Sequence, residues 1–245
     1  MKRHSNSRKG AATSAGSRGY TLLELMVSLF ILAVLTGTIF EQINRIQRKS
    51  GSEAVKLDLT QQAREFVSQT VRDLHMSGYP NASMYSNPPA GSNLVAAGLV
   101  SASPTQILFE GDVNSDGTVS SVNIYYVPSD PTDPNCPCIR RGAVIKIPGD
   151  SLHQPVSPTY TETGNVFPPG TGGGQSGEDL FTYYKQNGDP VDVGSGVDIS
   201  SPEGVATISQ IKTVKINLSL LTSLRDPVTN GLIRTTISAT ARLNQ

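Results

Sequence analysis

Tryptophan is absent from the 245 residues, and cysteine occurs only twice, at Cys136 and Cys138. Two cysteines exclude a small fold held together by several disulfides, so an apolar core must stabilise any globular part. Histidine occurs three times, at His4, His75 and His153, and no nucleophile, base and orienting acid can be read from the spacing of such residues. The sequence therefore gives no reason to expect an enzyme.

Acidic residues are missing from the first 19 positions, which hold five basic residues: Lys2, Arg3, Arg8, Lys9 and Arg18. The rest of the chain has 15 basic and 20 acidic residues, a net charge of −5. Nucleic-acid binding depends on clustered lysine and arginine, so no nucleic-acid partner is expected. Residues 1–19 also lack apolar periodicity, and we expect a basic leader peptide outside the fold.

One long hydrophobic run follows this leader. Residues 22–40 contain nineteen residues with a single charge, enough for a helix to cross a bilayer. An ordinary secretory signal has a shorter apolar part and a small-residue cleavage site. The sequence thus predicts a membrane-spanning helix. The basic residues before it favour an N-terminus in the cytoplasm and a C-terminal part outside.

Glu24 is the one charged residue of this run. A carboxylate within a membrane helix costs about 2.5 to 3.5 kcal/mol on insertion scales. Two interpretations are open: the side chain reaches back to the membrane interface, or it meets a positive partner within the membrane.

The string Gly19-Tyr20-Thr21-Leu22-Leu23-Glu24-Leu25, after a basic leader, resembles the processing site of type IV prepilins and of type II secretion pseudopilins. The resemblance implies that a prepilin peptidase cuts between Gly19 and Tyr20 and that the new amine of Tyr20 is methylated. It also implies that Glu24 neutralises the terminal amine of a neighbouring subunit. An amine and a carboxylate buried together cost less than either group alone, and glycine offers a protease an unhindered backbone.

The helical pattern continues beyond the apolar run. A helix is predicted from Tyr20 to His75, ending before the Gly78 and Pro80 breakers, and its second half carries an apolar stripe at spacings of three and four: Leu59, Ala63, Phe66, Val67, Val71 and Leu74. Strands are predicted at residues 106–110, 121–127, 142–147, 180–185, 210–220 and 232–243. The expected fold is α+β, with the second half of the helix packed on an antiparallel β-sheet head.

This pattern predicts four parts of the chain. They are the leader at 1–19, a transmembrane half-helix at 20–40, a stalk helix at 41–78 and a β-rich head at 79–245.

The segment from Val71 to Tyr79 resembles the helix end of PilW-type minor pilins and of J-type pseudopilins. Major pilins usually carry a proline just beyond the membrane span, and this chain has none between Tyr20 and Tyr79. The resemblance implies a minor pilin that helps to prime, assemble or cap a filament together with other minor and major pilins. A J-type pseudopilin of a type II secretion system and a membrane-anchored module that binds calcium or a surface remain alternatives.

Asp112, Asn114 and Asp116 followed by Gly117 match the first half of a calcium-binding loop. The twelfth position of such a loop is Asn123 here, so the usual bidentate glutamate is missing. The same residue types also make hairpin turns, and calcium is the one cofactor that the sequence suggests.

Cys136 and Cys138 flank a single proline. Two thiolates without a nearby histidine or further cysteine make a poor zinc site, whereas an oxidising envelope favours a disulfide. Extended residues two apart place their Cα atoms at about 6.5 Å, near the upper limit for a disulfide. The bond can therefore lie within this chain, at some strain, or join another subunit.

Overall fold

The computed structural model describes residues 21–86, 92–170, 178–226 and 231–244. The chain divides into two compact units, Met1–Arg48 and Lys49–Gln245, and the division falls within the first helix. The fold is α+β, as predicted, with one long helix followed by antiparallel sheets.

Helix α1 runs from Leu22 to His75 without interruption. Thr21 precedes its first turn, and the Thr21 hydroxyl accepts a hydrogen bond from the backbone N–H of Glu24 at 3.3 Å. The helix ends where Gly78 adopts a φ of 82° and Pro80 follows, because neither residue continues a helix. The predicted end at His75 is confirmed, and the predicted start at Tyr20 lies outside the described residues.

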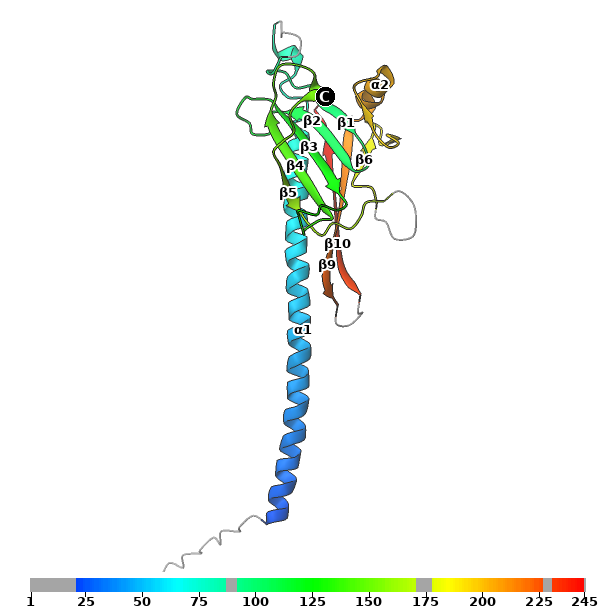
Figure 1. Cartoon of the computed structure of the whole chain (residues 1–245). Coiled ribbons are helices and arrows are strands. Elements are labelled where there is room, and N and C mark those ends of the chain that lie inside the picture. Colours follow the sequence, from blue (N-terminus) through cyan, green and yellow to red (C-terminus); the bar gives the residue numbers. More distant parts are fainter. Residues whose placement is uncertain (1–20, 87–91, 171–177, 227–230, 245) are drawn as a thin grey trace, which may run out of the picture. The chain divides into compact units, whose positions relative to one another are not determined.

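The described residues from Lys49 onward form ten strands in two antiparallel sheets, most of which are labelled in Figure 1. The six-stranded sheet has the order β5-β4-β3-β2-β1-β8, and the four-stranded sheet has the order β10-β9-β6-β7. The bounds are β1 Leu99–Ala102, β2 Gln106–Gly111, β3 Ser120–Val127, β4 Cys138–Ile145, β5 Thr159–Thr163, β6 Phe181–Tyr184, β7 Pro190–Val191, β8 Val197–Asp198, β9 Thr213–Arg225 and β10 Leu232–Arg242. Three short helices complete the described elements: η1 Ala82–Met84, η2 Ser151–His153 and α2 Pro202–Gln210.

The core lies between the second half of α1 and the apolar faces of both sheets. All members of the predicted stripe belong to it, and only Val71 is partly exposed. Strands β2, β3 and β4 supply Phe109, Val122 and Ile139, and β9 supplies Ile216 and Leu218. The predicted packing of the helix on a β-sheet head is therefore confirmed.

Gly111, the last residue of β2, lets the end of α1 approach the six-stranded sheet closely. A Cβ at this position would lie 2.8 Å from the carbonyl carbon of Met76, inside the limit for real contacts. The backbone of Gly78 donates to Glu110 and that of Asp112 donates to Tyr79, both at 2.9 Å. These bonds join the chain just after α1 to an inner strand of the sheet.

A buried ion pair also joins α1 to this sheet. The Asp73 carboxylate, 1% exposed, accepts hydrogen bonds from the Arg141 guanidinium at 2.8 and 3.0 Å. Burial raises the pKa of Asp73 above its usual value, although the positive charge of Arg141 opposes that rise. A second buried pair, between Glu110 on β2 and Lys146 just after β4, has an N–O distance of 2.6 Å.

Two predicted strands differ from the structure by more than one residue at their ends, and the other four agree within one residue. The strand expected at 142–147 is β4, Cys138–Ile145. Its first half contains two consecutive charged residues, Arg140 and Arg141, which interrupt the apolar alternation expected of a strand. The strand tolerates them because each pairs with a carboxylate that is distant in sequence. The strand expected at 210–220 starts at Thr213 and continues to Arg225, since Gln210 ends helix α2.

Helix α2 and four short strands are not among the predicted elements. Helix α2 has nine residues, too few to show a helical period, but Ser201 accepts a capping hydrogen bond from Gly204 and Pro202 occupies the first turn. Strands β7 and β8 have two residues each. The apolar pattern also does not reveal that the strands divide into two sheets.

We expect Asp73→Ala to destabilise the head, because it leaves the Arg141 charge in a largely buried site without its partner. Stranding one member of a buried pair costs about 3 to 5 kcal/mol, and each kcal/mol lowers the melting temperature by about 2 to 4 °C in a domain of this size. The measurement is the thermal loss of the near-ultraviolet circular dichroism of the tyrosines, with the full chain in neutral detergent.

Two controls make this measurement specific. The double variant Asp73→Leu, Arg141→Met removes both charges and should recover most of the loss. Glu41→Ala breaks the exposed Arg45–Glu41 pair on the same helix and should change little. A double variant as unstable as Asp73→Ala would contradict the assignment.

Candidate functional site

The segment of α1 from Leu22 to Phe40 presents a mostly apolar surface. Every side chain from Thr21 to Ser50 is exposed, and an 18-residue window of the helix has a mean hydropathy of 2.3 with none of it buried. The length and composition of this segment suit a membrane span. The segment therefore indicates membrane anchoring of the chain.

Glu24 lies in the first turn of this helix. Its backbone N–H donates to the carbonyl oxygen and to the hydroxyl of Thr21 at 3.0 and 3.3 Å. Thr21 and Glu24 have the spacing of a capping box, but within the described residues the reciprocal bond from the Thr21 N–H to the carboxylate is not made. The carboxylate forms no ion pair with any described cation. Gly19 and Tyr20, the predicted cleavage and methylation residues, lie outside the described residues.

The predicted calcium residues form a turn between β2 and β3. The two carboxylate oxygens of Asp112 accept the backbone N–H groups of Asp116 and Gly117 at 3.1 and 3.0 Å. Asp116 turns the other way and accepts from the backbone and hydroxyl of Thr118, and these bonds lower the pKa of Asp116. Asp112 is buried, whereas Asn114 and Asp116 are exposed. The arrangement closes a hairpin by itself, and calcium binding here stays a prediction.

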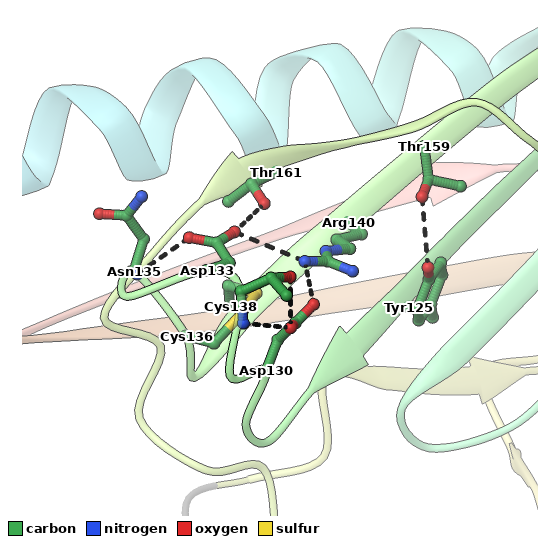
Figure 2. Close-up of polar contacts among 10 residues, drawn as sticks. Tyr125, Asp130, Asp133, Asn135, Cys136, Cys138, Arg140, Thr159 and Thr161 are labelled. Atoms are coloured by element: carbon green, nitrogen blue, oxygen red, sulfur yellow. Dashed lines mark hydrogen bonds and ion pairs between the residues drawn. A yellow bond between two sulfur atoms is a disulfide. The ribbon is translucent and has the colours of Figure 1, made fainter.

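Cys136 and Cys138 are joined by a disulfide, and their Cα atoms are 4.2 Å apart (Figure 2). The distance of about 6.5 Å expected for extended residues is wrong, because the chain turns between the two cysteines. The Asp133 carboxylate lies close to both sulfur atoms, so these three residues form a cluster of side chains of the kinds that bind metal ions. Metal ligation by cysteine requires a thiolate, and bonded sulfurs supply none.

A charged network not predicted from the sequence surrounds this disulfide (Figure 2). The Asp130 carboxylate accepts hydrogen bonds from the hydroxyl and backbone of Thr132 and from Arg140 at 2.7, 2.8 and 2.6 Å. These bonds, those from Thr132 first, lower the pKa of Asp130 to about 2. Asp133 accepts a hydrogen bond from Thr161 of β5, which lowers its pKa as well. The network fixes the β3–β4 loop to strand β5.

The aspartate-x-threonine spacing at Asp130 is the sequence signal that could have predicted part of this network, since aspartates in turns accept from the backbone two residues on. The hydrogen bonds from Arg140 and Thr161 could not be predicted in this way, because they depend on how strands β4 and β5 pair.

The two described histidines lie in different surroundings. His153, the last residue of η2, is exposed and contacts the Asp150 carboxylate at 2.8 Å. His75 is the last residue of α1 and lines a surface cleft. Neither is joined to a serine, threonine or cysteine by a hydrogen bond within the described part of the chain.

A family model described as the prokaryotic N-terminal methylation motif matches residues 14–40. The methylation motif of the type IV pilin and pseudopilin family is therefore present, and it indicates a type IV pilin or pseudopilin-like protein, a structural type of subunit. The match includes Gly19, Tyr20 and Glu24 and no part of the head. No curated protein and no solved structure matches the chain.

Asp112→Ala should destabilise the head whether or not calcium is present, because two backbone N–H groups lose their acceptor. Asp116 and Gly117 are exposed, so water can replace the lost acceptor, and we expect a loss of about 0.5 to 1.5 kcal/mol for each hydrogen bond. Thermal unfolding of the full chain with and without millimolar calcium measures both effects. Stabilisation of the unmodified chain by calcium, about 2.7 kcal/mol at a hundredfold excess over Kd, would contradict the simple turn and establish an ion site.

Proposed function

We propose that the chain is a minor pilin of PilW type that acts in the priming, assembly or capping of a pilus after cleavage by prepilin peptidase. The observation that carries this proposal is a carboxylate, Glu24, on the exposed apolar segment of α1 and within the matched methylation motif, where it pairs with no described cation. A simple membrane anchor needs no carboxylate at this depth.

The charge pattern supports an orientation for the anchored chain. Five basic residues precede the apolar segment and no acidic residue accompanies them, which favours a cytoplasmic leader and a periplasmic head. The inner membrane then holds the subunit until it enters a pilus or pseudopilus.

The proposed role of Glu24 is electrostatic. Cleavage after Gly19 would create an amine at Tyr20, and in an apolar surrounding a charged amine is costly unless a carboxylate pairs with it. Glu24 of a neighbouring subunit would supply that carboxylate. Other pilins are therefore the partners of this segment, and the prepilin peptidase acts before them.

The continuity of α1 favours a minor subunit. The helix contains no proline between Leu22 and His75, in contrast to the break that major pilins usually carry beyond the membrane span. A J-type pseudopilin of a type II secretion system would share this helix. A membrane-anchored binding module is a separate candidate, and it needs neither cleavage at Gly19 nor the charge of Glu24.

We expect the processed chain to begin at Tyr20 with a methylated amine, because the basic leader and Gly19 match the peptidase site. Mass spectrometry of the membrane-extracted protein from cells with and without active prepilin peptidase measures this. An intact leader in cells with an active peptidase would rule out the pilin proposal.

We expect Glu24→Ala to insert and fold normally but to lose its association with companion pilins. Removal of the carboxylate eases insertion by about 2.5 to 3.5 kcal/mol. Loss of one member of a buried pair costs about 3 to 5 kcal/mol, a factor of several hundred or more in association. The measurement is co-purification of the processed variant with companion pilins, normalised to its level in the membrane.

Three variants separate the charge of Glu24 from other roles. Glu24→Gln keeps a side chain that can complete the capping box with Thr21 but lacks the charge, so it should fail like Glu24→Ala. Glu24→Asp keeps the charge on a shorter stem and should be intermediate. Glu41→Ala removes an exposed carboxylate from the same helix and should assemble normally. Normal assembly of Glu24→Ala would favour the membrane-anchored binding module instead.

A further inference from the structure

Strand β10 forms one edge of the four-stranded sheet, with β9 as its paired neighbour (Figure 1). It spans eleven residues, Leu232–Arg242, whereas the edge strands β5, β7 and β8 span five, two and two residues. Proteins usually protect a strand edge with lysine, proline or a bulge, because unpaired backbone groups there can pair with another chain. Strand β10 contains neither lysine nor proline, and its irregularity in register lies at its start, between Leu232 and Arg234. It is therefore the longest edge strand of the described chain, and most of its length lacks such protection.

The register of β9 and β10 shows which backbone groups of β10 face away from β9. The N–H of Leu243 donates to the carbonyl oxygen of Lys212, the residue opposite it in this register, at 2.9 Å. Directly bonded pairs alternate along an antiparallel ladder, so every second residue of β10 bonds to β9 and the residues between them point outward. The outward residues are Arg234, Thr236, Ser238, Thr240 and Arg242. Their backbone N–H and C=O groups form no backbone hydrogen bond to any described residue.

The two faces of this edge differ in chemistry. The side chains of the five outward-pointing residues are exposed, with an arginine at each end and threonine or serine between them. On the other face, Ile237 and Ala239 pack against the core but are only partly buried. An added strand with apolar side chains on that face would extend the core over both of them.

The two arginines argue against a second copy of this chain as the added strand. An antiparallel pair of two β10 strands centred on Ser238 would put Arg234 of each copy opposite Arg242 of the other. Like charges directly opposite each other destabilise a strand pair. Neither arginine forms an ion pair with a described carboxylate, in contrast to Arg140, and Arg234 lies over the ring of Phe167 at 4.0 Å. Carboxylates at the two ends of an added strand would match these charges.

We infer that β10 binds an extended segment of a partner protein as an additional antiparallel strand. The segment carries carboxylates opposite Arg234 and Arg242, and its alternate side chains are apolar and cover the core side of the edge. The described pairs of this sheet are all antiparallel, and this pairing is slightly more stable than the parallel form. Strand addition takes its affinity from main-chain hydrogen bonds and its specificity from alternate side chains. This inference does not depend on the proposed role in a pilus.

The test is the fluorescence anisotropy of a labelled peptide, Glu-Val-Thr-Val-Thr-Val-Thr-Val-Glu, titrated with the full chain in neutral detergent. Paired antiparallel with residues 234–242, its glutamates lie opposite the two arginines and its valines lie on the core side. Methylation of the valine N–H groups should preserve binding, because these groups face away from β10, and it prevents the peptide from pairing with itself. Methylation of the threonine N–H groups removes the donors that face β10 and should weaken binding at least about tenfold.

Ser238→Pro tests the edge from the side of the protein. It removes an outward N–H from the middle of β10 without removing a bond to β9, and proline is tolerated in edge strands. Binding of the valine-methylated peptide should weaken at least about tenfold, with an unchanged near-ultraviolet spectrum. Ser238→Val is the matched control, since it changes the same side chain but keeps the N–H, and it should bind normally.

A peptide with lysine in place of both glutamates tests the charges and should bind at least about tenfold more weakly, because each end then opposes an arginine. The comparison of the two methylated peptides uses the unmodified chain, so it holds even if Ser238→Pro disturbs the fold. Equal binding of these two peptides, binding of neither, or equal binding of the lysine and glutamate peptides would overturn the inference. A dimer in sedimentation that Ser238→Pro dissociates would also overturn it, because the edge would then belong to a second copy.

Discussion

The head depends on the burial of one stripe of α1 against two sheets. Leu59, Ala63, Phe66, Val67 and Leu74 are each no more than 6% exposed, and residues of both sheets share their core. Burial of each large apolar side chain contributes about 1.5 to 3 kcal/mol. Hydrogen bonds from Tyr183 to Ser103 and from Phe181 to Pro104 also join β6 to the turn between β1 and β2, so the shared core and these bonds together hold the sheets in one unit.

The two halves of α1 differ in how their apolar side chains are covered. The half that follows Arg48 has a polar face and a buried stripe, whereas the segment up to Phe40 is mostly apolar and has no protein cover of its own. A helix of the first kind is stable in water, and one of the second kind needs lipid or other helices. A single uninterrupted helix therefore combines a segment suited to an apolar environment with one suited to water, and Glu24 is the one charged residue of the apolar segment.

The sequence predicts those features that depend on the spacing of residues close together in the chain. The apolar run, the motif around Gly19 and Glu24, and the stripe from Leu59 to Leu74 each depend on local spacing, and so does the turn at Asp112. The two-sheet arrangement does not, because it depends on which strands pair. The Asp73–Arg141 contact joins residues 68 positions apart, and no local pattern marks either as a partner of the other.

The candidate sites show the same division. Residue types alone point to Asp112, Asn114 and Asp116, but only the hydrogen bonds show that the Asp112 oxygens already close the turn. The disulfide distance was misjudged because the extended geometry assumed for Cys136 and Cys138 does not hold in a turn. The unpaired edge of β10 could not be seen in the sequence, since it depends on the order and register of the strands.

The close approach at Gly111 has a mechanical consequence. The chain after α1 is bonded to β2, an inner strand of the six-stranded sheet, through Gly78 and Asp112, and Asp73 is bonded to β4 through Arg141. A tensile load applied along the helix would therefore enter the sheet through its interior, where neighbouring strands on both sides share it. Edge strands such as β8, held by two residue pairs, would carry little of that load.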